Sequence, residues 1–262
     1  MQITQLNLYP IKSAKAYTVN QAWVLPQGLN FDREFMITEA DGTFITARKE
    51  ALLYRLSAFP TPLGVVIHLD NGERCFARYA DFKQLQTSEV WGTHFVSWVA
   101  DEAVNQWLSN HFGRAVQLRW IGEQSRRSVK NFEPHPMSFG DSNPILLVSE
   151  QSLAQVRQWS PVPVNMEQFR ANIVIDGVEA FEEEQWRRIQ IGEVTFSFAQ
   201  CCTRCILITR NVQTLELDPK AEPFRTLKTH HTNENGKPIF GIHLVPENSG
   251  VIRVGDFVQL LD

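Results

Sequence analysis

The sequence of 262 residues contains no long hydrophobic run. No segment approaches the ~18 consecutive apolar residues that a membrane-spanning helix requires. The first residues, Met1 to Gln5, also lack the basic stretch and the apolar stretch of a secretory signal. We therefore expect a cytoplasmic protein with no membrane partner.

An excess of basic residues is absent as well. Lysine and arginine number 25 against 29 aspartate and glutamate residues, which gives a net charge of −4. A surface that binds nucleic acid is normally basic. We therefore expect no nucleic-acid partner, although this balance leaves room for a small basic pocket.

Cysteine is scarce and unevenly placed. Three of the four cysteines lie within five consecutive positions, which makes a poor disulfide framework and fits a reducing compartment. Cys202 and Cys205 form a C-x-x-C, but a structural zinc site needs four ligands. Cys75 stands alone and His230 and His231 are adjacent, so the spacing does not predict zinc.

The distribution of apolar residues is typical of a mainly β (α+β) protein. Alternation of the kind seen in His94–Val99 is what a half-buried strand requires. Asp41-Gly42 and Asn71-Gly72 are typical of tight turns between strands. The predicted strands cover residues 65–67, 94–99, 116–120, 172–175, 194–198, 205–208, 239–244 and 251–261.

Helices are predicted to be few. Capping residues precede three short helical segments, at Asp101, Ser149 and Pro223. The segment 122–141 is polar and contains several basic residues and prolines, so we interpret it as a loop at a domain boundary. The predicted domains are residues 1–120 and 121–262, both rich in strands.

Cys205 is the first candidate for chemistry. It follows Arg204 and leads into an apolar run, 206–209, that we expect to be a strand. A thiolate binds soft metals and attacks electrophiles, and nearby cations favour the thiolate over the thiol. Cys205 is therefore a metal ligand, a nucleophile or an inert buried thiol, and Cys201 and Cys202 are expected only to pack.

Two further candidates lie near the N-terminus. Lys12 and Ser13 follow a proline turn, and a cation beside a hydroxyl can bind a phosphate group. Arg33 precedes a predicted strand, and its guanidinium suits a phosphate or the edge of a pterin. Taken alone, Lys12 and Ser13 fit a solvated turn better than a binding site. Arg33 fits a surface ion pair with Asp32 or Glu34 equally well.

The remaining candidates lie in the second half. Arg170 and Asn172 are two residues apart at the start of a predicted strand, so their side chains should share one side. An arginine beside an amide suits an anionic heterocycle, although a polar strand edge explains the pair as well. Ser142 and Asn143 form a polar turn that suits the lining of a pocket.

These pieces occur together, in this order, in the MOSC-domain proteins. The chain resembles most the YcbX-type proteins and the amidoxime-reducing components, and the resemblance covers essentially its whole length. It implies an N-terminal β-barrel domain, a MOSC β-barrel, and a bound molybdenum cofactor, which is a pterin dithiolene with a terminal phosphate. The matching segments are 10–13, 28–33, 89–93, 168–175, 203–205 and 248–256.

The resemblance also implies roles for single residues. The family's metal-ligating and catalytic cysteine falls on Cys205. Ala171 replaces a common proline, and 208–212 departs from the usual Thr-Thr-Val-Asp-Pro, so any role of that acid is in doubt. The family's other cofactor-binding positions fall on Lys12, Ser13, Arg33, Ser142, Asn143, Arg170, Asn172 and Thr203.

The function implied is the reduction of small N-hydroxylated compounds, namely hydroxylamines, amidoximes and N-hydroxylated bases. Four cysteines in this arrangement do not supply a 2Fe-2S cluster. We therefore expect electrons from a separate 2Fe-2S ferredoxin-like or flavin-containing partner, or a longer natural chain. Two alternatives are sulfur transfer through a persulfide on Cys205 and a non-catalytic cofactor-binding module.

Overall fold

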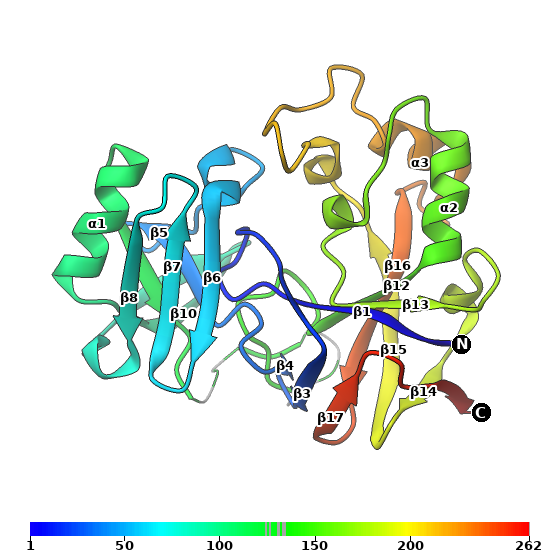
Figure 1. Ribbon diagram of the computed structural model, residues 1–262, viewed down its shortest axis with the longest axis horizontal. Coiled ribbons are helices and arrows are strands. Elements are labelled where there is room, and N and C mark those ends of the chain that lie inside the picture. Colours follow the sequence, from blue (N-terminus) through cyan, green and yellow to red (C-terminus); the bar gives the residue numbers. More distant parts are fainter. Residues whose placement is uncertain (124, 126, 130–131, 133–134, 262) are drawn as a thin grey trace. The chain divides into compact units, whose positions relative to one another are not determined.

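The computed structural model describes residues 1–123, 125, 127–129, 132 and 135–261 (Figure 1). Strands make up 42% and helices 19% of it, which confirms the mainly β prediction. The chain forms two compact units. Unit 1 contains Met1–Asn7, Thr18–Asn30 and Asn143–Asp262, and unit 2 contains Leu8–Tyr17 and Phe31–Ser142.

This division differs from the contiguous domains 1–120 and 121–262 that the sequence suggested. The N-terminal strand belongs to unit 1 because it pairs antiparallel with a strand near residue 175. The segment from 121 to 142 stays with unit 2, and the chain passes into unit 1 at Asn143. The predicted domain boundary at 120/121 stays a prediction, and the loop predicted over 122–141 includes residues that lie outside the described ranges.

Unit 1 is built on an eight-stranded sheet in the order β18-β14-β15-β16-β12-β13-β1-β2. A second sheet has the order β17-β3-β4. Neither closes into the expected barrel within the described residues. The strands are β1 (Gln2–Leu8), β2 (Tyr17–Val19), β3 (Gln21–Leu25), β4 (Gly28–Leu29), β12 (Ile145–Ser149), β13 (Ile173–Asp176), β14 (Arg188–Ile191), β15 (Val194–Thr203), β16 (Ile239–Pro246), β17 (Gly250–Arg253) and β18 (Val258–Leu261).

Two helices, α2 (Glu150–Trp159) and α3 (Phe224–His230), lie side by side against this sheet (Figure 1). The predicted cap of α2 is confirmed, because the Ser152 backbone N–H donates to Ser149 Oγ at 3.1 Å. The third predicted helix is also confirmed and begins after Pro223. The core beneath them includes Leu146, Val148, Leu153, Val156, Phe169, Val174, Cys202, Ile208, Leu227 and Phe240.

Three short 3-10 turns complete unit 1: η3 (Met166–Phe169), η4 (Glu182–Gln185) and η5 (Ile206–Thr209). The strand predicted at 205–208 is wrong, because this segment forms η5. Its hydrogen bonds close locally, with the Ile208 backbone N donating to Cys205 O at 3.3 Å and the Thr209 side-chain Oγ1 donating to Ile206 O at 2.8 Å. The single strand predicted over 251–261 is broken into β17 and β18.

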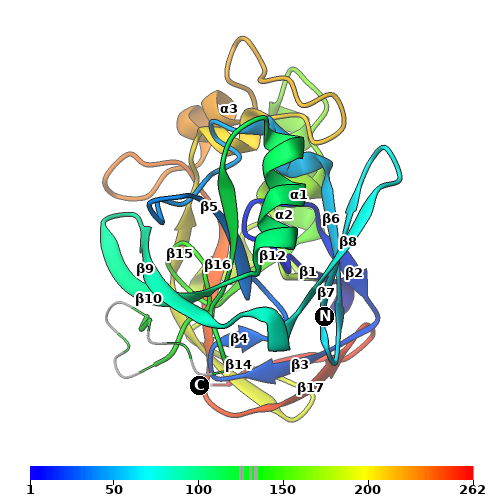
Figure 2. The same cartoon turned by 90° about the vertical axis from the view of Figure 1, so that its left-hand side faces the viewer.

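Unit 2 contains two open sheets, ordered β5-β11-β10-β9 and β6-β7-β8. Helix α1 (Glu102–Phe112) lies against β11 and β8 (Figure 2). Its predicted cap is confirmed, since Val104 N donates to Asp101 Oδ1 at 2.9 Å. The other elements are β5 (Phe35–Glu39), η1 (Ala51–Arg55), β6 (Leu56–Thr61), β7 (Gly64–Leu69), β8 (Arg74–Arg78), η2 (Tyr79–Asp81), β9 (Gln84–Val90), β10 (Thr93–Val99) and β11 (Val116–Trp120).

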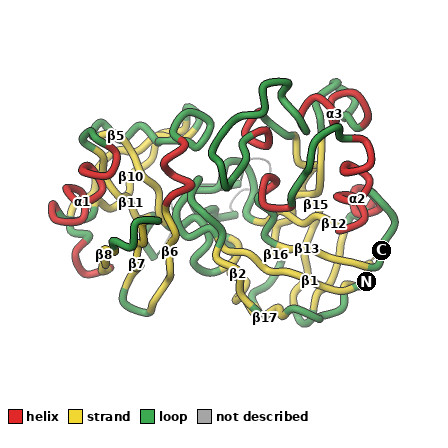
Figure 3. The backbone as a smooth tube through the Cα atoms, turned by 45° about the horizontal axis from the view of Figure 1, so that its top comes forward, coloured by secondary structure: helices red, strands yellow, loops and turns green. Residues whose placement is uncertain are grey.

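Both predicted tight turns lie in unit 2. Asn71-Gly72 joins β7 to β8, and Gly72 N donates to Leu69 O at 3.0 Å. Asp41-Gly42 returns the chain after β5 so that Thr38 pairs with Phe44. Figure 3 shows how strands dominate the fold and how short its helices are. Of the helices in the described residues, none is both long enough and apolar enough to span a membrane.

Glu183 is a fully buried carboxylate that braces the start of α2. It accepts from Ser149 Oγ at 3.1 Å and from Ser152 Oγ at 2.7 Å, and its burial raises its pKa. We expect Glu183→Ala to lower the free energy of unfolding by about 2–4 kcal/mol, because buried hydroxyl donors lose their acceptor. Chemical denaturation checks this; Gln185→Ala, an exposed change in the same turn, is the control and should have little effect.

Candidate functional site

The predicted site residues fall into two sets, one in each unit. In unit 2, the segment with Lys12 and Ser13 runs alongside the segment with Arg33. Lys12 N donates to Phe35 O at 2.7 Å, and Arg33 N donates to Tyr9 O at 2.9 Å. Ser13 and Arg33 both adopt left-handed backbone conformations, with φ of 69° and 50°. The structure thus brings these three residues together within one unit.

Lys12 is buried, with 5% of its surface exposed. Its Nζ donates to Phe139 O at 2.8 Å and forms an ion pair with Asp141. Burial lowers the pKa of Lys12, as do the charges of Arg127 and Arg33, while Asp141 opposes them. Because 55% of the Asp141 side chain is exposed, solvent screens part of this ion pair.

Arg33 is held by a buried carboxylate. It forms an ion pair with Asp32, whose Oδ1 also accepts from Tyr9 N at 2.8 Å. The guanidinium lies over the Tyr9 ring, with Cζ 4.4 Å from the ring centre. Burial opposes the charge, but Asp32 outweighs burial and raises the pKa of Arg33. Arg33 therefore stays a fixed cation.

Arg127 is a further buried cation of unit 2, and the sequence placed it only in a predicted loop. Its Nη1 donates to the carbonyls of Ser138 and of Gly140, the latter at 3.0 Å, while its Nε is buried without a hydrogen-bond partner. Burial lowers the pKa of Arg127 to about 10, against the opposing charge of Asp141. We call Lys12, Arg33 and Arg127 the cationic cluster.

Asp141 is the anion that faces the cationic cluster. Its Oδ1 accepts from Trp91 Nε1 at 3.0 Å besides pairing with Lys12. The positive charge of Lys12 and the hydrogen bonds from Lys12 and Trp91 hold the pKa of Asp141 well below its usual range. The next residue, Ser142, is exposed and ends unit 2, and the half-buried Asn143 begins the last segment of unit 1.

In unit 1, Cys205 is a partly exposed thiol at the start of η5. Thr203, two residues earlier, is exposed and ends β15, where it pairs with Ile239. The chain thus leaves the sheet between these two residues, and the local bonds of η5 fix where Cys205 lies. A cysteine that is partly exposed at a tight turn is accessible to a ligand.

Arg170 does not lie in a strand, so the geometry predicted for it is wrong. It ends η3 in a left-handed conformation, with φ of 59°, and β13 begins only at Ile173. Asn172 is buried, its Nδ2 donating to Asn7 O at 3.1 Å and its Oδ1 accepting from Leu146 N at 3.2 Å. Its amide thus ties β13 to β1 and β12, and direct contact with a cofactor stays a prediction.

Two side-chain bridges join η3 to the segment that carries Cys205. Gln168 Nε2 donates to Ile208 O at 2.7 Å. Arg204 Nη2 donates to Phe169 O, also at 2.7 Å. These bonds connect the last two residues of η3 with Ile208 of η5 and with Arg204, which precedes Cys205. The two turns therefore hold each other in position.

Cys202, expected only to pack, has an ionic partner. It is 6% exposed, and Arg204 Nη1 donates to its Sγ at 2.9 Å. Burial opposes ionisation, but Arg204 and the His243 ring outweigh burial and lower the pKa of Cys202 to about 6. The adjacent Cys201 behaves oppositely, because burial and Glu184 raise its pKa. The neighbouring Arg204 was the one sequence signal for this pair.

The low pKa of Cys202 predicts a pH-dependent contribution to stability. The group binds its proton more weakly in the folded chain, so its contribution is present above the ordinary pKa of 9.0 and is lost as the pH falls through about 6. We expect the difference in unfolding free energy between the native protein and Cys202→Ser to rise between these pH values, by at most about 1.4 kcal/mol per pH unit. Denaturant titrations at several pH values measure it, and a flat difference would contradict it.

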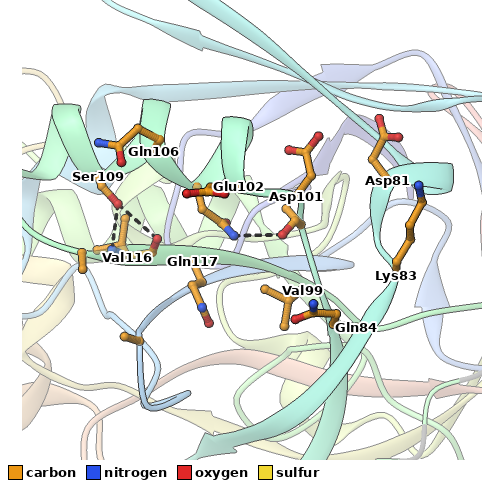
Figure 4. A pocket seen from close by; sticks show the side chains of 14 residues that line it. Asp81, Lys83, Gln84, Val99, Asp101, Glu102, Gln106, Ser109, Val116 and Gln117 are labelled. Carbon is orange, nitrogen blue, oxygen red and sulfur yellow. Dashed lines mark hydrogen bonds between the residues drawn. The ribbon is translucent and has the colours of Figure 1, made fainter.

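Two cavities are lined by none of the predicted site residues. One in unit 2, of about 560 Å³, is lined by the start of α1 and by β10 and β11 (Figure 4). Asp81, Asp101 and Glu102 border it, and none of the predicted site residues does. A cavity of about 340 Å³ in unit 1 lies against η3 and η5, at Gln168 and Thr209. The described residues contain no cluster of three side chains suited to hold a metal ion.

Sequence comparisons place these residues in a family. Residues 1–115 match the MOSC N-terminal beta barrel domain and residues 134–259 match the MOSC domain. Mitochondrial amidoxime-reducing component 1 of Mus musculus is 30% identical over 99% of this chain and 82% of its own length. Mitochondrial amidoxime reducing component 2 of Macaca fascicularis is 27% identical over 97% of this chain and 82% of its own.

A different kind of relative matches only in part. Molybdenum cofactor sulfurase of Drosophila pseudoobscura pseudoobscura is 30% identical over 93% of this chain, which spans 32% of that protein. The amidoxime-reducing components, by contrast, match over most of their length. The chain therefore belongs to the MOSC-domain family, as a protein of the type represented by the mitochondrial amidoxime-reducing components.

Proposed function

We propose that this protein binds a molybdenum cofactor and reduces small N-hydroxylated compounds, with electrons from a separate iron–sulfur or flavin protein. The observation that carries the proposal is the partly exposed thiol of Cys205, fixed at the start of η5. The names and the full-length match of the amidoxime-reducing components support the reaction. The substrates are hydroxylamines, amidoximes and N-hydroxylated bases.

Each unit, taken by itself, holds donor groups that suit one part of such a cofactor. A thiolate is a soft ligand and suits a metal that is already bound to dithiolene sulfurs. The cationic cluster of unit 2 suits the terminal phosphate, because Lys12 and Arg127 are buried cations and Arg127 Nε is buried without a hydrogen-bond partner. Asp141 and Asp32 pair with Lys12 and Arg33, so the cluster keeps one net positive charge, which suits an anionic ligand.

When bound, the cofactor supplies the two electrons that convert an N–OH group and two protons into an amine and water. Cys205 acts as the metal ligand and gives up its thiol proton when the metal binds. Lys12, Arg33 and Arg127 bind the phosphate, and Ser13 adds a hydroxyl beside Lys12. Asn172 holds β1, β12 and β13 together next to Arg170.

The test is to express the protein in a host that makes the cofactor and to measure molybdenum and pterin in the purified sample. We expect near-stoichiometric molybdenum, together with reduction of an amidoxime, a hydroxylamine and an N-hydroxylated base by a chemical electron donor. Absence of molybdenum and pterin, even after reconstitution with the cofactor, would overturn the proposal. Bound cofactor without turnover of any of the three would leave only a binding function.

Sulfur transfer is the second candidate, and the match to molybdenum cofactor sulfurase favours it. In that case Cys205 would carry a persulfide, as its partial exposure permits. Mass spectrometry of the intact protein and of its peptides would then show one added sulfur atom on Cys205. A sulfur-free Cys205 in an active reductase excludes this candidate.

A further inference from the structure

Arg204 occupies the centre of a network in unit 1 that lies beside Cys205 in the chain. Its Nη1 donates to Cys202 Sγ at 2.9 Å and its Nη2 donates to Phe169 O at 2.7 Å. Its guanidinium also lies over the Phe169 ring, with Cζ 5.4 Å from the ring centre. That ring packs on Phe240 at 4.0 Å between centres. The orientation of the guanidinium is therefore fixed from three sides.

Cys202 provides the negative charge of this network. It lies in the apolar core at the end of β15, and within the described residues no carboxylate forms an ion pair with Arg204. The guanidinium of Arg204 is partly buried, and a charge withdrawn from water needs an anion or strong acceptors. A thiolate forms a charge-assisted hydrogen bond, which is stronger than the bond that a neutral thiol accepts. Cys202 and Arg204 stabilise each other's charges.

This network connects the two turns that carry the predicted ligand residues. Phe169 O, which accepts from Arg204, belongs to the residue before Arg170. On the other side, Arg204 directly precedes Cys205, and its backbone N donates to Pro238 O at 2.8 Å. Any rotation of the guanidinium away from Cys202 would release Phe169 O and with it the end of η3. The hydrogen bond from Gln168 Nε2 to Ile208 O would then be the one remaining side-chain bridge between the two turns, so their coupling would weaken.

We propose that Cys202 and Arg204 form a positioning pair that fixes η5, which follows Cys205, against η3, which precedes Arg170. This proposal rests on the proposed function only in assigning the ligand role to Cys205. Neither member of the pair touches the reacting atoms, so both are positioning residues. Cys202 thus has a role of its own, distinct from that of Cys205 and of Cys201.

The first test needs no cofactor. Hydrogen exchange of peptides covering η3 and η5 is compared between the native protein, Cys202→Ala, and Cys202→Asp, which restores an anion. In Cys202→Ala we expect exchange in both turns to accelerate together, roughly tenfold, and in Cys202→Asp to return toward the native rate. Cys201→Ser is the matched control, because the Arg204 side chain bonds the thiol of Cys202 and not that of Cys201. This variant should leave hydrogen exchange in both turns unchanged.

The second test uses the loaded protein. Molybdenum content and the electron paramagnetic resonance spectrum of the one-electron-oxidised or -reduced metal are compared for the same variants. In Cys202→Ala we expect the molybdenum content to fall about tenfold and the lines of the spectrum to broaden. In Cys202→Asp both the molybdenum content and the line width should return toward their native values. Arg204→Lys keeps a charge but not the planar fork, so it should resemble Cys202→Ala.

The outcomes separate the two proposals. Unchanged exchange in η3 and η5 for Cys202→Ala would overturn the positioning pair whatever the metal content. Faster exchange confined to η5 would also overturn it, because the coupling of the two turns is the claim. Coupled acceleration in a protein that never binds molybdenum would support the pair and reject the proposed function.

Discussion

Cys205→Ser is expected to lower kcat/KM for N-hydroxylated substrates by more than about a hundredfold. Loss of a group that only orients a metal ligand typically costs 10–100-fold in metal affinity or activity, and Cys205 is the proposed ligand itself. A serine hydroxyl is a harder and far less acidic donor than a thiol, so it replaces the thiolate poorly at a soft metal. The assay uses saturating electron donor, with activity expressed per molybdenum bound.

The control for this experiment is another cysteine. Cys75→Ser changes a partly buried thiol of unit 2 that lies outside both sets of site residues, and it should keep native activity. Circular dichroism should be native in both variants. A loss of molybdenum or of activity in Cys205→Ser then reflects the lost ligand and not a lost fold. Full activity of Cys205→Ser per molybdenum bound would remove Cys205 from the site.

Lys12→Met is expected to weaken cofactor binding by roughly 10–100-fold, the loss that removal of a charged hydrogen bond produces. The effect has two parts, because the phosphate loses a buried cation while Asp141 remains as an unpaired anion nearby. The double variant Lys12→Met/Asp141→Asn removes that anion and should recover part of the affinity. Titration of the cofactor-free protein with isolated cofactor measures all of these values.

Lys15→Met is the matched control for the lysine. Lys15 lies three residues further along, pairs with Asp70 at the surface, and has 35% of its side chain exposed. Removing a screened surface charge changes binding little. The affinity of Lys15→Met for the cofactor should therefore equal that of the native protein. Equal losses in Lys12→Met and Lys15→Met would show that net charge matters and that the cationic cluster does not.

Much of the secondary structure could be predicted because its signals are local. The caps at Asp101 and Ser149 and the Asn71-Gly72 turn each depend on a few consecutive residues, and all three are confirmed. The segment 206–209 was predicted wrongly because three apolar residues in a row fit a strand and a 3-10 turn equally. What decided was that the chain leaves the sheet at Thr203, which no local pattern reveals.

Candidate site residues could be named from the sequence only where they belong to a recognisable motif. Lys12 and Arg33 lie on adjacent segments of unit 2, while their role in binding a cofactor stays a prediction. Arg127 was not identified, because the carbonyls that it contacts, of Ser138 and Gly140, lie 11 and 13 residues further along and belong to no local motif. Cys202 was missed for a similar reason, since the His243 ring that helps lower its pKa lies on another strand, β16.

During synthesis of this protein, β1 must wait for β13 before the two strands can pair. Thr4 donates a hydrogen bond to Val174, 170 residues further along. At translation rates of about 5–20 residues per second, the first strand leaves the ribosome roughly ten seconds or more before its partner exists. During that interval the apolar side chains of Ile3, Leu6 and Leu8, which are buried in the folded protein, are exposed to the cell. Nascent chains of this protein should therefore be clients of ribosome-associated chaperones.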